Sequence, residues 1–114
     1  MKNYGKRAET LAAWFLILRG YKILERNYHS RFGEIDIIAK KDGVTVFVEV
    51  KARSGKMLGT PANAVDIYKQ QKIIKTAYRY LLRCPDTECR FDVVEVVTRG
   101  LRVTVNHIKN AFEL

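Results

Sequence analysis

The sequence predicts an α/β protein in which a mixed β-sheet is flanked by helices. Five segments either alternate apolar with polar residues or form short Val- and Ile-rich runs, and Asp42-Gly43 separates two of them as a hairpin turn would. Two further segments carry apolar residues at helical spacing. The predicted order is α-β-β-β-α-β-β. A helix between the third and fourth strands implies a crossover connection and therefore a mixed sheet.

The first helix is expected at residues 4–19, where Gly20 provides a stop. A connection follows at residues 29–32, and a turn is expected at Arg99-Gly100. The predicted strands are residues 21–27, 34–40, 44–51, 90–98 and 101–108.

The second helix is expected to begin near Pro61, which a first helical turn tolerates, and to run to about Arg83, because Pro85 enforces its end. Its apolar residues define a core-facing row, and Gln70 lies on that row. The row consists of Ile67, Ile74, Ala77, Tyr78 and Leu81.

The chain has 114 residues, of which 47% are apolar, and we predict a single domain over residues 1–114. No apolar run approaches the ~18 residues that a membrane helix needs, and nothing reads as a signal peptide, so we expect a cytoplasmic protein without a membrane partner. In that compartment Cys84 and Cys89 are expected to be free thiols. A redox-sensitive disulfide is the alternative, and a structural zinc site lacks its further ligands.

The charge is unevenly distributed along the chain. A net charge of +9 and a pI near 9.8 favour a polyanionic partner, with nucleic acid ahead of an acidic membrane surface. Residues 1–31 carry +5, residues 32–50 carry −2, residues 51–84 carry +7 and residues 85–114 carry −1. An acidic centre between basic segments suits a metal site within a phosphate-binding surface, although chance clustering would produce the same pattern.

The central hairpin carries the candidate site. Residues two apart in a strand share a face, so Glu49 and Lys51 point the same way. A two-residue turn at Asp42-Gly43 pairs the residues that flank it and brings Asp36 opposite Glu49. This register depends on the turn, because a slip of one residue would separate the two acids.

Charged residues in a strand of Val, Ile and Phe need a physical reason, because a buried charge must be paired or coordinate a metal. Asp36 and Glu49 offer oxygen ligands that suit Mg²⁺ or Mn²⁺. A bound metal ion would activate water and neutralise charge on a phosphate, while Lys51 would orient that water or stabilise the developing charge. The alternative is a half-exposed hairpin face held by salt bridges.

This hairpin resembles the PD-(D/E)xK signature of restriction-endonuclease-like nucleases. Residues 33–39 (GEIDIIA) and 46–53 (VFVEVKAR) resemble in particular the YraN family of small bacterial proteins, which is similar to archaeal Holliday junction resolvases. The proline that gives the signature its name is absent, and Ile35 precedes Asp36 instead. The resemblance covers nearly the whole chain, with support from residues 5–9, 64–65, 69–70 and 90–94.

The resemblance implies a restriction-endonuclease-like αβββαβ core. It also implies that Asp36, Glu49 and the backbone carbonyl of Val50 hold the metal, that Lys51 is the catalytic lysine, and that Glu9 of the first helix joins the site. On the residues alone, Glu9 is either a solvated helix acid or a site ligand through water, and the solvated acid is favoured.

Further residues complete the predicted site. Gln70 on the core-facing row either positions water or phosphate, or is a core glutamine bonded to backbone. The remaining four are assigned to nucleic-acid binding, with a solvated helix face as the alternative for Lys72. They are Arg53, Lys56, Lys69 and Lys72.

Two functions follow. The first is a metal-dependent DNA endonuclease with selectivity for branched or irregular structure, since no base-reading module is appended. Nothing in the sequence separates DNA from RNA as its substrate, and related resolvases act as dimers, which leads us to expect a homodimer. The second is a nucleic-acid-binding adaptor with a weak or silent site that acts through protein partners.

Overall fold

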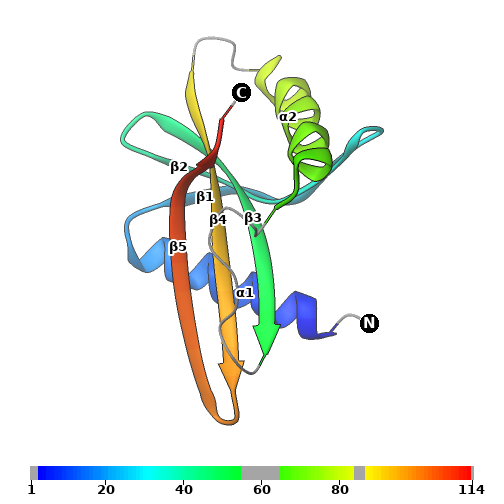
Figure 1. The fold of residues 1–114 in the computed structure, drawn as a ribbon. Helices are drawn as coiled ribbons and strands as arrows, with labels where there is room; N and C mark the ends of the chain where they lie inside the picture. The colour runs from blue at the N-terminus through cyan, green and yellow to red at the C-terminus, as the bar shows by residue number, and fades with distance from the viewer. Residues whose placement is uncertain (1–2, 55–64, 84–86, 114) are drawn as a thin grey trace.

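The computed structural model describes residues 3–54, 65–83 and 87–113. Its elements follow the predicted order, and the α/β class is confirmed (Figure 1). The elements are α1 (Asn3–Leu18), β1 (Lys22–Ser30), β2 (Gly33–Lys41), β3 (Val44–Ser54), α2 (Ile67–Leu81), β4 (Glu88–Arg99) and β5 (Arg102–Phe112). Neither of these helices, in the part of the chain that is described, is long and apolar enough to cross a membrane.

The strands form one mixed sheet in the order β1-β2-β3-β4-β5. The central pair, β3 and β4, is parallel, and every other neighbouring pair is antiparallel. Parallel neighbours need a crossover connection, and α2 lies in it. The five-stranded mixed sheet with two helices is consistent with the restriction-endonuclease-like core that the resemblance implies.

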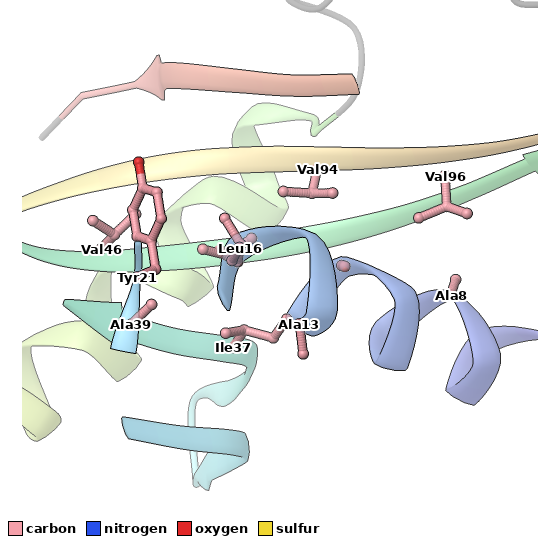
Figure 2. Close-up of a cluster of buried hydrophobic side chains, with 11 residues drawn as sticks. Ala8, Ala13, Leu16, Tyr21, Ile37, Ala39, Val46, Val94 and Val96 are labelled. Atoms are coloured by element: carbon pink, nitrogen blue, oxygen red, sulfur yellow. The ribbon is translucent and has the colours of Figure 1, made fainter. Parts of the chain in front are cut away.

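A helix packs on each face of the sheet (Figure 1). On one face, small side chains of α1 allow the helix to approach the strands closely, and Leu16 fills the space between them (Figure 2). The residues labelled in that cluster are Ala8, Ala13, Leu16, Tyr21, Ile37, Ala39, Val46, Val94 and Val96. On the opposite face, α2 covers Phe47 and Phe91, whose rings stack with centroids 5.4 Å apart.

The buried face of α2 differs from the predicted row. Ile67 and Tyr78 are exposed by 67% and 54%, so the row was predicted wrongly at these positions. The buried residues are Ile73, Thr76, Ala77 and Tyr80. Apolar residues occupy several adjacent positions of this helix. The sequence is therefore compatible with two alternative core-facing rows that differ by about one residue. The true row includes Thr76, because its hydroxyl is satisfied by hydrogen bonds to the Lys72 carbonyl and to Ser30.

The boundaries also differ at several ends. Helix α2 begins at Ile67, after the predicted start, because the Asp66 side chain caps it by accepting a hydrogen bond from the Lys69 N–H at 2.8 Å. Pro61 lies outside the described residues, as do Cys84 and Pro85. Strand β1 continues through His29 and Ser30, which were predicted as a connection. Cys89 is a free thiol in the described part of the chain.

The predicted hairpin turn is confirmed. Asp42 and Gly43 have φ values of 53° and 80°, the left-handed pair that a tight two-residue hairpin turn requires. Lys41 pairs with Val44, and the ladder continues in that register to the pair Ile37–Val48.

Candidate active site

Asp36 lies where β2 and β3 cease to pair. The register of the hairpin would place it opposite Glu49, but the ladder ends one pair earlier, at Ile37 and Val48. Instead the Asp36 side chain accepts a hydrogen bond from the Val50 N–H, with its Oδ2 2.8 Å from the nitrogen. The carboxylate therefore takes the place of a ladder hydrogen bond and is fixed against β3.

A break in the side-chain alternation of β2 accompanies this contact. Ile35 packs in the cluster under α2, whereas Ile37 packs in the cluster under α1. Residues two apart in a regular strand share a face, so the strand is irregular at Asp36. Asn27, in the neighbouring strand β1, has a φ of 54° and marks a distortion at the same level of the sheet.

Glu49 is buried, with 5% of the residue exposed. It follows Phe47 on the face of β3 that α2 covers, and Lys69 reaches it from the first turn of that helix. The Lys69 Nζ lies 2.6 Å from the Glu49 Oε2. The sequence assigned Lys69 to nucleic-acid binding, but the structure places its ammonium group on one of the two predicted metal ligands.

The two acids are electrostatically coupled. Burial raises the pKa of Asp36 to about 8, and the charges of Glu49 and, less strongly, Glu9 act in the same direction. The hydrogen bond from Val50 and the charge of Lys69 act against this rise. Partial burial opposes the charged form of Lys69, but the hydrogen bond and charge of Glu49 outweigh it and raise the lysine pKa. With both acids ionised the pair would carry two negative charges against one ammonium group, and the raised pKa of Asp36 reflects that imbalance.

Lys51 is half-buried on β3, two residues after Glu49 and on the same face. Its register partner on the parallel strand β4 is Glu95. Within the described ranges Lys51 has no ion-pair partner. Lys51 is thus the next residue after Glu49 on this face of β3, and no described side chain forms an ion pair with it.

Glu9 lies on α1, and its Oε1 is 4.0 Å from the Nη2 of Arg26. Its charge is felt by Asp36, so it belongs to the electrostatic surroundings of the site. Gln70 is half-buried and donates from its Nε2 to the Val65 carbonyl at 2.8 Å. This is the backbone-bonded arrangement that the sequence left open as the alternative to a role with water or phosphate.

The four residues assigned to nucleic-acid binding fall in different surroundings. Arg53 donates from its Nε to the Glu95 carboxylate at 2.8 Å, so its charge is largely committed within the sheet. Lys72 is exposed on α2. Lys56 lies outside the described residues, and Lys69 contacts the acid pair.

The residues present fit a hard divalent cation. The described residues contain no group of three or more His, Cys, Asp or Glu arranged to hold a metal. Asp36 and Glu49, with the backbone carbonyl of Val50, nevertheless form an oxygen donor set of the kind that Mg²⁺ and Mn²⁺ prefer. The raised pKa of Asp36 favours a cation here, because ionising this carboxyl beside Glu49 calls for more positive charge than Lys69 alone supplies.

Two buried acids escaped the sequence analysis. Glu95 is 5% exposed and shares a sheet face with Lys51, and the only signal for it was a lone acid among the valines of β4. Asp92 is fully buried and accepts two hydrogen bonds from Arg90 as well as one from the Asn110 N–H. The His107 Nε2 lies 2.7 Å from its Oδ2. Asp92 is therefore a structural acid on the α1 side of the sheet.

Fold and site together define a class: an α/β protein whose mixed sheet carries a buried carboxylate pair and a lysine on one hairpin. The chain belongs to the family described as "Uncharacterised protein family UPF0102", whose model matches residues 8–96. It is 49% identical over 115 residues to a UPF0102 protein of Lachnoclostridium phytofermentans, covering 98% of this chain and 94% of that protein. It is 46% identical over 112 residues to one of Persephonella marina, covering 96% and 93%, and 41% identical over 114 residues to one of Myxococcus xanthus, covering 98% and 90%.

Proposed function

We propose that the protein is a metal-dependent DNA endonuclease that hydrolyses phosphodiester bonds, with selectivity for branched or otherwise irregular DNA. The observation that carries this proposal is the electrostatically coupled pair of the half-buried Asp36 and the buried Glu49, with Lys51 two residues after Glu49 on the same face of β3. Burial and mutual repulsion raise the pKa of Asp36 to about 8, an arrangement that favours a bound cation. Strongly shifted groups of this kind concentrate at functional sites.

Each residue has a distinct task in this proposal. Asp36, Glu49 and the Val50 carbonyl hold Mg²⁺ or Mn²⁺, which when bound supplies activation of water and neutralisation of phosphate charge. Lys51 orients the attacking water or balances charge on the phosphate. The Lys69 ammonium group neutralises Glu49 while no cation is bound and must be displaced by one, and Glu9 adds negative charge that favours the cation.

The charge of the chain supports a polyanionic substrate. A net charge of +9 attracts nucleic acid through phosphate contacts, which makes affinity fall steeply as salt rises. Exposed lysines of α2, among them Lys72 and Lys75, provide such contacts on the face that carries the site. A homodimer remains part of the proposal, because an enzyme that cuts both strands of a branch needs two sites.

The test is cleavage of labelled duplex, single-stranded, flap and four-way-junction DNA with Mg²⁺, with Mn²⁺ and with EDTA. We expect metal-dependent cutting that the Lys51→Ala variant loses. Lys40→Ala is the matched control, because Lys40 is exposed at the other end of the same hairpin. Absence of cutting with either metal, with salt-sensitive DNA binding retained, would overturn the nuclease proposal.

An adaptor function is the second candidate, and one observation favours it. Helix α1 exposes Trp14 by 59% and Leu18 by 82%, which would suit contact with a protein partner. Asp36→Ala separates the two candidates. A nuclease loses cleavage and keeps or gains DNA affinity, because the variant removes negative charge. An adaptor keeps DNA binding and has no cleavage to lose.

A further inference from the structure

A groove lies next to the acid pair, on the side of the turn between β1 and β2. Its volume is about 270 Å³, close to the lower size of ligand pockets. Lys69 links the two regions, because it lines the groove and its Nζ contacts Glu49. We call this the α2 groove, and its other lining residues used below are Gly33, Glu34, Asp66, Tyr68 and Lys72.

The groove has one aromatic wall. Tyr68 is 74% exposed although it belongs to the first turn of α2, and the Lys72 Nζ lies 5.2 Å from its ring centroid. This cation–π contact positions the ring, while most of the tyrosine surface stays open to solvent. An exposed, positioned aromatic ring beside a strand-cutting site is a surface on which a nucleobase can stack.

The charges in the groove select a base over a phosphate. Glu34 and Asp66 line it beside Lys69 and Lys72, and the Lys69 ammonium group is held by Glu49. Each carboxylate has one partner, since His29 Nε2 lies 2.9 Å from Glu34 Oε1 and Asp66 Oδ1 accepts from the Lys69 N–H, but a carboxylate accepts several hydrogen bonds. Carboxylates accept hydrogen bonds from base amino groups, as in the contact of Asp or Glu with cytosine N4. The phosphates would instead contact lysines at the rim of the groove, where Lys72 and Lys75 are exposed along α2.

The turn between β1 and β2 is held close to α2. A Cβ at Gly33 would lie 3.5 Å from the Lys72 Cβ, and Gly33 has a φ of 154°, which a side chain disfavours. Ser30 and Thr76 share a hydrogen bond of 3.0 Å between the same two elements. These contacts fix the two walls of the groove relative to each other.

We propose that the α2 groove binds one unpaired nucleobase of the DNA strand, stacked on Tyr68, with the adjoining phosphate on Lys72. The proposal rests on the proposed function for its choice of DNA. On this proposal, a substrate differs from perfect duplex by having an unpaired nucleotide next to the scissile bond. In perfect duplex the base would first have to leave the stack.

The test is binding without cleavage, measured by fluorescence anisotropy in EDTA with two probes. One is short single-stranded oligo-dC, and the other is an abasic strand of equal length, which has the same phosphates and no bases. We expect the protein to bind oligo-dC about tenfold more tightly than the abasic strand. Tyr68→Ala should remove this difference, and Tyr68→Phe should retain it.

Tyr78→Ala is the matched control, because Tyr78 is 54% exposed on the same helix and does not line the groove. It should keep the tenfold preference. Equal loss of affinity for both probes in Tyr68→Ala, or no loss, would overturn the base site. Because no metal is present, a preference that depends on Tyr68 stands even if the nuclease proposal fails, and cleavage without that preference would refute the base site alone.

Discussion

Two aspartates of one sheet, Asp92 on β4 and Asp36 on β2, have opposite surroundings. Asp92 accepts hydrogen bonds from Arg90, His107 and the Asn110 N–H; burial alone would raise its pKa, but these contacts outweigh it and hold the pKa below the usual value. Asp36 has one backbone hydrogen bond, an acidic neighbour and a pKa raised to about 8. Burial therefore does not identify a site acid. The balance of charges and hydrogen bonds around the carboxylate distinguishes the two acids, because the partners of Asp92 stabilise its charged form and those of Asp36 do not.

The largest effect should come from neutralising the satisfied acid. Asp92→Asn leaves the half-buried Arg90 without its charge partner, so we expect the free energy of unfolding to fall by about 3 kcal/mol. Asp36→Asn keeps an acceptor for the Val50 N–H and removes the carboxylate that burial and Glu49 disfavour, so its unfolding free energy at neutral pH should rise rather than fall. Urea unfolding at neutral pH measures both. Equal destabilisation would show that Asp36 is as structural as Asp92.

The pH dependence of stability should differ between the two acids. Because the folded-state pKa of Asp36 is raised from 3.8 to about 8, the folded protein holds a proton that the unfolded chain has lost in that window. Its stability contribution therefore declines as pH rises from about 4 to 8, by at most about 1.4 kcal/mol per pH unit. Asp92, with its lowered pKa, contributes a stabilisation that is lost only as pH falls below 3.8.

Urea unfolding of the wild type and of Asp36→Asn across this window isolates the Asp36 contribution as the difference between the two curves. We expect a decline with pH in the wild type that the variant lacks. Mg²⁺ or Mn²⁺ should reduce the decline, because a cation favours the charged carboxylate. A decline of equal slope in both proteins would assign it to other groups.

The smallest effect concerns Lys69, whose ammonium group already contacts Glu49 of the pair. A metal ion must compete with the Lys69 ammonium group for Glu49, so Lys69→Gln should tighten Mn²⁺ binding about fivefold, or ~1 kcal/mol. Lys72→Gln removes the same charge one turn away and should change the affinity less. Isothermal titration with Mn²⁺ measures both. Weaker binding in Lys69→Gln would mean that Lys69 positions Glu49 for the metal rather than competing with it.

The local parts of the fold were predictable from the sequence. Asp42-Gly43 determines the turn type, and the turn determines the register as far as Ile37 and Val48. The sequence also predicted that Asp36 and Glu49 come together, although the expected strand pair is replaced by the hydrogen bond from the Val50 N–H to Asp36. The turn chemistry and the period-two alternation act over a few residues, so one sequence is enough to read them.

The remaining parts depend on contacts between distant segments. The buried side of α2 could not be read from its apolar residues, because Thr76 is satisfied only by Ser30 and by its own helix. In the sequence Lys69 has the features of a surface lysine, and only the packing of α2 over β3 brings its ammonium group to Glu49. Asp92 required His107, from the neighbouring strand, to be recognised as a structural acid. Tertiary pairing of polar groups leaves no periodic signal.

The parallel pairing of β3 with β4 has a consequence for synthesis on the ribosome. The acid pair lies on a hairpin that emerges early, but the second edge of β3 is completed only by β4, which follows α2 in the chain. Until β4 is translated, the hairpin that bears Asp36 and Glu49 has an open edge and lacks half of the core beneath it. The nascent chain therefore carries both carboxylates of the pair well before it can hold them in place.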